Sequence, residues 1–128
     1  MPLSALQPSQ LYISSEKLEA VRRRYRPDNM TSLPPVPIKK LGRSLVITDG
    51  HTRAAAAALA GLTEVLVYWE DEELGWDLYR VCIRWCRRAG IRTIYELKDR
   101  IISPEQYQRL WLKRCARMQT AQRRKRGS

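Results

Sequence analysis

Residues 46–55 read VITDGHTRAA, and they mark the point where a strand gives way to a helix. The β-branched residues before Asp49 favour an extended strand, whereas the five consecutive alanines that begin at Ala54 favour a helix. Gly50 provides the turn between them, and Gly61 provides a left-handed end to the helix. This strand, turn and helix predict a sheet with an alanine-rich helix packed closely against it.

The first turn of this helix also predicts a site for an anion. The first amide groups of a helix have no acceptor within the helix, and the helix dipole favours negative charge beside them. A flexible glycine, a hydroxyl, an imidazole, a guanidinium and a carboxylate lie together here, in Asp49, Gly50, His51, Thr52 and Arg53. A structural alternative is that Asp49 caps the helix and Arg53 forms an ion pair with an acidic residue.

The sequence before and after this unit predicts further strands and helices. Apolar or β-branched runs bounded by Gly, Pro, Asn or Asp are typical of strands, and a serine before a 3.6-residue apolar period is typical of a helix start. The alternation predicts an α/β or α+β core over residues 1–73. The expected elements are a strand at 10–13, a helix from Ser14 or Ser15 through Tyr25, a hairpin at 36–40 and 44–48, the helix at 51–60 and a buried strand at 62–69.

The rest of the chain is predicted to be helical. Apolar residues recur at steps of three and four until Gly90, and patterns typical of capping boxes begin at Thr93 and Ser103. Residues 74–119 are therefore expected to form a C-terminal helical extension packed on the core. Residues 120–128 hold almost no apolar side chain, so they are expected to be a disordered basic tail.

Positive charge is concentrated near the C-terminus of this chain of 128 residues, whose formal net charge is +11. Such a distribution indicates a phosphate-bearing partner, either a nucleotide or a nucleic acid. The segments 93–100 and 103–118 fit a helix-turn-helix that contacts DNA, and the alternative is a helical cap with a basic solvent face. The residues expected to face DNA are Arg109, Lys113, Arg117, Arg123, Arg124, Lys125 and Arg126.

The composition argues against several other classes of protein. The longest run without a polar residue has nine residues (54–62), against the roughly 18 that span a membrane. The first eleven residues contain no Lys or Arg and no apolar stretch, so we expect a cytoplasmic protein without a secretory signal. Three cysteines and one histidine do not fit a metal site, and Cys82 and Cys86 are expected to be reduced core thiols.

Three segments together resemble the ParB/sulfiredoxin superfamily, namely LPPVPI at 33–38, LVITDGHTRAAA at 45–56 and AGLTEVLV at 60–67. The resemblance covers about residues 6–70. It implies a small mixed sheet with helices and a nucleotide whose phosphates bind at Gly50 and Arg53. The implied nucleotide is CTP, ATP or ADP, with magnesium. Sulfiredoxins carry a cysteine where this chain has His51, so their repair activity is not expected.

Two functions follow from the resemblance. The first is a nucleotide-binding regulator related to chromosome or plasmid partition proteins, which contacts DNA through residues 81–128. The second is a small phosphotransferase similar to the free-serine kinases of this superfamily, which place a catalytic glutamate just after the first strand. Glu16 would then be the general base, and a solvated helix position is its alternative role. Both functions leave a homodimer open.

Overall fold

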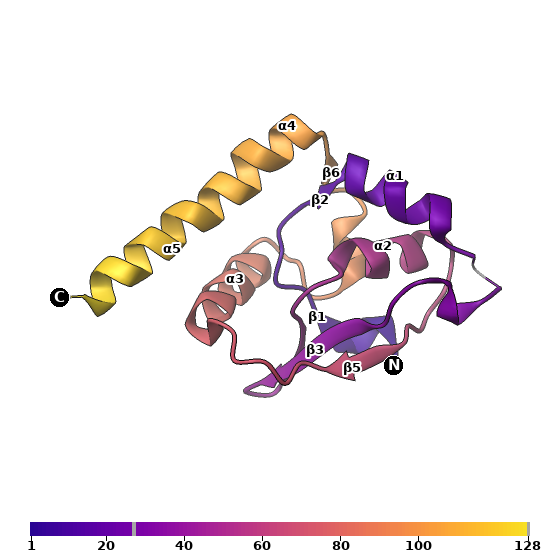
Figure 1. Cartoon of the computed structure of the whole chain (residues 1–128), viewed down its shortest axis with the longest axis horizontal. Coiled ribbons are helices and arrows are strands. Elements are labelled where there is room, and N and C mark those ends of the chain that lie inside the picture. The colour runs from indigo at the N-terminus through magenta and orange to yellow at the C-terminus, as the bar shows by residue number, and fades with distance from the viewer. Residues whose placement is uncertain (27, 128) are drawn as a thin grey trace.

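The computed structural model describes residues 1–26 and 28–127 and confirms a mixed α/β fold (Figure 1). The main sheet has the strand order β1-β4-β3-β5, and β2 and β6 form a separate two-stranded parallel sheet. The strands are β1 (Leu6–Gln7), β2 (Ile13–Ser14), β3 (Val36–Leu41), β4 (Ser44–Ile47), β5 (Val67–Trp69) and β6 (Ile101–Ile102).

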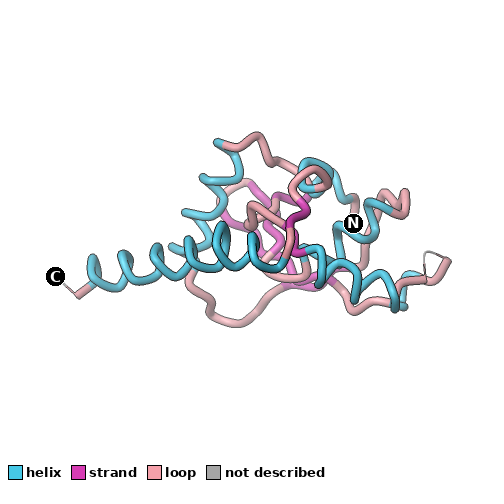
Figure 2. The backbone as a smooth tube through the Cα atoms, turned by 90° about the horizontal axis from the view of Figure 1, so that it is seen from above, coloured by secondary structure: helices cyan, strands magenta, loops and turns pink. Residues whose placement is uncertain are grey.

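The helices cover the sheets and extend beyond them toward the C-terminus (Figure 1, Figure 2). The α-helices are α1 (Ser15–Arg24), α2 (His51–Leu59), α3 (Trp76–Arg88), α4 (Pro104–Tyr107) and α5 (Lys113–Arg126). Three short 3-10 helices are η1 (Leu3–Ala5), η2 (Met30–Ser32) and η3 (Ile94–Leu97), and the π-helical segment η4 (Gln108–Leu112) joins α4 to α5. Within residues 1–26 and 28–127, none of these helices has the length and apolar character that crossing a bilayer requires.

The predicted hairpin is confirmed and leads directly into the predicted helix. Strands β3 and β4 pair antiparallel, with Ile38 opposite Ile47, and the turn between them contains Gly42 at φ 62°. After β4 the chain turns at Gly50, whose φ is 76°, and enters α2. A positive φ of this size is readily adopted only by glycine, so the turn depends on that residue.

Helix α2 lies inside the fold because its side chains are small. Residues Ala54 to Ala57 are at most 3% exposed. Helix α1 packs on α2, and strands β2 and β3 also contact it. Ser14 caps α1 by accepting a hydrogen bond from the Lys17 amide, as the sequence predicts. The close contact of α1 with α2 places the helical face of α1 that holds Lys17 and Arg24 beside the first turn of α2.

The C-terminal extension shares the core of the N-terminal part. Ile13 pairs with Ile101 between β2 and β6, and the Gln7 side chain donates to the carbonyl of Ile91 at 2.9 Å. Ile91, Ile94 and Leu97 belong to the same hydrophobic cluster as the residues of the first strands. The division expected near residue 73 therefore does not separate two hydrophobic cores.

Three expectations differ from the structure in the second half of the chain. The strand expected at 62–69 is shortened to β5, which lies at the edge of the sheet, and its residues Tyr68 and Trp69 are exposed. The segment 93–100 contains only η3, so it does not form a helix-turn-helix with the rod of α4, η4 and α5. Both differences arise because the ends of short strands and helices depend on pairing and packing with segments that are distant in the sequence.

The third difference concerns the basic tail. Helix α5 continues to Arg126, whereas disorder is expected from residue 120 onward; Ser128 lies outside the described residues. Ala, Gln, Arg and Lys are favourable helix formers, and no Gly or Pro interrupts the helix before Gly127. The helix therefore continues without apolar anchors.

Candidate functional site

The turn between β4 and α2 presents free amide groups to one side. The first helical hydrogen bond runs from the Ala54 amide to the Gly50 carbonyl at 3.1 Å. The amides of residues 51–53 precede that bond and have no acceptor within the helix. Gly50 is the N-cap and offers no side-chain acceptor, while Asp49 Oδ1 accepts from the Gly50 amide at 2.8 Å. Asp49 therefore orders the turn rather than capping α2 as the structural alternative requires.

Arg53 holds this turn against the loop that precedes β3. Its Nη1 donates to the carbonyls of Pro34 at 3.1 Å and Pro35 at 2.8 Å. A methyl group added at Gly50 would lie 2.7 Å from Nη2 and 2.8 Å from Nε of Arg53. The one salt bridge found within residues 1–26 and 28–127 joins Arg80 to Asp77, so the structural alternative, in which Arg53 forms an ion pair with an acidic residue, is wrong. Its guanidinium is positioned by carbonyls and keeps its net charge.

His51 is held inside the protein in its neutral form. It is 4% exposed, and its Nε2 accepts a hydrogen bond from the Ser9 amide at 2.9 Å. Burial lowers the pKa of His51 to about 4, against a smaller opposing effect of the Asp49 charge. The imidazole hydrogen therefore lies on Nδ1 at neutral pH. His51 fixes the N-terminal segment to α2 and adds no positive charge to the site.

A cavity of about 490 Å³ opens at this turn and is lined by cations from two helices. Lys17 and Arg24 come from α1, and Arg53 comes from α2. Asp49, Gly50, His51 and Thr52 also line it, so the structure brings all five predicted phosphate-site residues to one cavity. We call this cavity the basic pocket.

Sequence reasoning missed the contribution of α1 to the basic pocket. Lys17, Ala20, Val21 and Arg24 line it, and their spacing of three, four and seven residues places them on one helical face. The Lys17 ammonium lies 5.1 Å from the centre of the Tyr107 ring, which also lines the pocket. The sequence alone shows that Lys17 and Arg24 share one helical face, but it does not show that this face of α1 lies beside α2.

The other predicted functional residues lie elsewhere. Glu16 is exposed in the first turn of α1 and is not among the residues that line the basic pocket. The predicted DNA-contacting side chains through Lys125 are exposed on η4 and α5, outside the basic pocket. The structure therefore brings neither the candidate base nor the basic side chains of η4 and α5 to the pocket at the Asp49–Arg53 turn.

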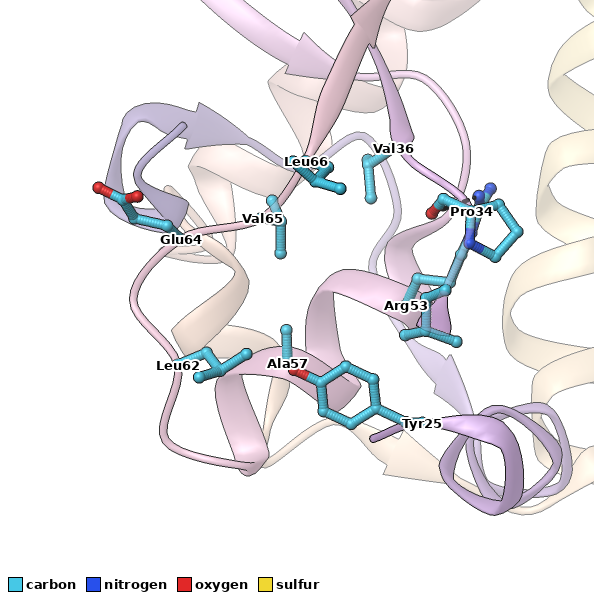
Figure 3. Close-up of a pocket in the computed structure, with 10 residues that line it drawn as sticks. Tyr25, Pro34, Val36, Arg53, Ala57, Leu62, Glu64, Val65 and Leu66 are labelled. Atoms are coloured by element: carbon cyan, nitrogen blue, oxygen red, sulfur yellow. Dashed lines mark hydrogen bonds between the residues drawn. The ribbon is translucent and has the colours of Figure 1, made fainter. Parts of the chain in front are cut away.

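Arg53 also lines a second, much smaller cavity (Figure 3). Its volume is about 30 Å³, and Val36, Leu62 and Val65 supply apolar walls. The buried hydroxyl of Tyr25 reaches it and has no hydrogen-bond partner within the described part of the chain. Room of this size suits one or two water molecules rather than a nucleotide.

Metal binding and relationships to known proteins add no further assignment. Within residues 1–26 and 28–127, no group of three or more His, Cys, Asp or Glu side chains is arranged to hold a metal ion. Comparison with protein-family models and with curated protein sequences gives no match to this chain.

Proposed function

We propose that this protein binds the phosphate groups of a nucleotide in the basic pocket and that its fold is of the ParB/sulfiredoxin type. The observation that carries the proposal is that Lys17, Arg24 and Arg53 line one cavity together with the first turn of α2, whose first amides have no acceptor within the helix. Phosphate oxygens accept hydrogen bonds from such amides and from the forked guanidinium group. Because carbonyls already orient Arg53, little side-chain entropy is lost when phosphate binds.

The same pocket fits magnesium as a companion of the phosphates. Asp49 is the one carboxylate among the residues that line it, and the hydroxyl of Thr52 lies in the same cavity. Magnesium is commonly held by one or two carboxylates together with phosphate oxygens. A bound magnesium ion would neutralise phosphate charge, while the cations of α1 and α2 position the nucleotide. No described contact places Glu16 at this pocket, so the geometry supports binding more directly than phosphate transfer.

The decisive experiment compares cations that line the pocket with neighbours that do not. Thermal stability of the full chain is measured with CTP, ATP and ADP, with and without magnesium. At a concentration one hundred times the dissociation constant, a ligand that binds only the folded state stabilises it by about 2.7 kcal/mol. The double substitution Lys17→Gln with Arg24→Gln should abolish this stabilisation, whereas Arg22→Gln with Arg23→Gln on the same helix should preserve it. No stabilisation of the wild-type chain by any nucleotide contradicts the proposal.

The exposed face of α5 supports DNA as a second partner. Arg109, Lys113, Arg117 and Arg124 are all exposed and lie on one side of the helical rod at roughly helical spacing. Glu105 lies four residues before Arg109, and no Asp or Glu follows it in the sequence, so Lys113, Arg117 and Arg124 have no acidic residue farther along the rod. Contact of such a stripe with the DNA backbone releases counterions. We therefore propose nonspecific DNA binding through the rod rather than through a helix-turn-helix.

DNA binding is tested by its dependence on salt. Fluorescence anisotropy with a labelled duplex should show affinity that falls steeply between 50 and 200 mM salt. Changing Arg109, Lys113 and Arg117 to Gln should reduce the slope of log affinity against log salt by about two to three. Arg22→Gln with Arg23→Gln on α1, which do not line the basic pocket, serves as the control. An equal change of slope per neutralised cation in the two variants contradicts a specific role of the rod.

A further inference from the structure

A neutral cavity of about 350 Å³ adjoins the basic pocket. Gln10 and His51 line both cavities, so the two share a wall at the first turn of α2. Most of the other lining residues come from α3 and from the rod, which pack on each other through the edge-to-face contact of Trp85 with Trp111. This neutral cavity therefore exists only where the C-terminal helices meet the N-terminal core.

The chemistry of the neutral cavity contrasts with the charge of the protein. No Lys, Arg, Asp or Glu is among its lining residues, although the formal net charge of the chain is +11. Leu78, Trp111 and Met118 provide apolar surface. His51 contributes an imidazole that is 4% exposed and whose Nε2 accepts a hydrogen bond from the Ser9 amide. Transfer of a charged group into such surroundings is unfavourable, so the fitting occupant is uncharged.

Most polar groups that line the neutral cavity already form hydrogen bonds within the protein. The Tyr79 hydroxyl donates to the Thr48 carbonyl at 2.9 Å, and the Ser9 hydroxyl donates to the Ile47 carbonyl at 2.7 Å. The side-chain amide of Gln119 remains at the exposed rim. An uncharged ring system bound in this cavity would therefore make apolar and aromatic contacts with the walls and a few hydrogen bonds at the edge.

We infer that the neutral cavity holds the nucleoside part of the ligand whose phosphates lie in the basic pocket. The inference rests on the proposed function and adds a location for the uncharged half of the ligand. A nucleotide has the required division, because an uncharged ring system is joined through a sugar to anionic phosphates. Gln10 and His51, at the shared wall, lie where the sugar connects the two halves.

The test separates the two halves of the ligand. Calorimetric titration of the wild-type chain uses sodium tripolyphosphate, which carries only the phosphate chemistry, and CTP and ATP, which carry both. At least one nucleotide should bind tenfold or more tightly than tripolyphosphate. Met118→Trp fills the neutral cavity from α5 and should weaken that nucleotide at least tenfold while changing tripolyphosphate affinity less than twofold.

Matched variants keep the result interpretable. Leu110→Trp adds the same side chain to the same rod at a residue that is 37% exposed and does not line the cavity, so nucleotide affinity should be unchanged. Leu78→Trp fills the cavity from α3 and replaces Met118→Trp if that variant does not fold. Unchanged nucleotide affinity in a folded cavity-filling variant, or equal affinity of tripolyphosphate and nucleotides for the wild type, overturns the inference. Binding of none of the three probes instead overturns the basic-pocket proposal.

Discussion

Substitution of Gly50 by alanine tests the geometry on which the phosphate site depends. Gly50 has a φ of 76°, and a left-handed conformation costs a non-glycine residue about 1 to 2 kcal/mol. The new methyl group would lie 2.7 Å from Nη2 of Arg53, well inside van der Waals contact. The guanidinium must then move away from the Pro34 and Pro35 carbonyls.

Besides the backbone strain, Gly50→Ala costs the free energy of the two hydrogen bonds that the displaced guanidinium loses. A hydrogen bond to a charged group contributes about 1.5 to 3 kcal/mol when it is shielded from solvent. Both bonds of Arg53 are exposed, so water competes for the same groups, and we assign about 1 kcal/mol to the pair. Gly50→Ala should therefore lower the free energy of unfolding by about 2 to 3 kcal/mol.

Gly90 is a matched control because it isolates the backbone contribution. Its φ is 78°, close to that of Gly50, and no atom lies within 4 Å of an added methyl group. Gly90→Ala should cost only the backbone strain of about 1 to 2 kcal/mol. Arg53→Ala removes the steric conflict, so Gly50→Ala in that background should also cost only the strain. The difference of about 1 kcal/mol is the coupling energy of a double-mutant cycle.

Urea denaturation followed by tryptophan fluorescence measures all four proteins of the cycle and the Gly90 control. Nucleotide titration of the folded variants completes the assay, because a displaced guanidinium should also weaken phosphate binding. Equal costs for Gly50→Ala and Gly90→Ala, or an unchanged cost of Gly50→Ala when Arg53 is absent, would refute the proposed packing of Arg53 on the turn.

Three further predictions concern single groups. Burial lowers the pKa of His51 from 6.5 to about 4, so between these pH values the unfolded chain binds more protons than the folded chain. The free energy of unfolding should therefore fall by up to about 3 kcal/mol as the pH drops from 6.5 to 4. Urea denaturation across this pH range measures the fall, and His51→Gln should remove it. Tyr25→Phe removes a buried hydroxyl without a described partner, so the melting temperature should stay constant or rise, and a marked fall would reveal a missing contact. Thr93→Ala breaks the capping box with Glu96 and should cost about 1 kcal/mol, measured by urea denaturation against the exposed control Arg92→Ala.

Local features of the fold were predictable because their causes lie within a few residues. The side chains of Ser14, Thr93 and Ser103 accept backbone hydrogen bonds at three helix starts, as their patterns predict. The hairpin and the left-handed conformation of Gly61 also follow from turn chemistry. Such interactions are formed by neighbours in the chain, so a single sequence contains the needed information.

Features that depend on distant partners were predicted less well. The strand expected at 62–69 pairs with β3 only over β5, since that is where its backbone meets Val36–Ile38. The helix-turn-helix was wrong because residues 100 and 101 pair with the segment around Ile13. Glu16 is exposed and does not line the basic pocket, whereas the next residue, Lys17, does. Consecutive residues of a helix lie on different faces, and only the packing of α1 shows which face meets the pocket.

The sequence by itself determined the turn at Gly50, the alanine helix that follows and the excess of positive charge, because these depend on backbone preferences and residue types. Only the tertiary structure decided which cations meet the free amides of α2. That choice depends on α1 packing on α2 and on β6 joining β2, contacts between segments far apart in the chain. The burial of His51 and the neutral cavity beside it arise in the same way, since water is excluded only when those segments come together.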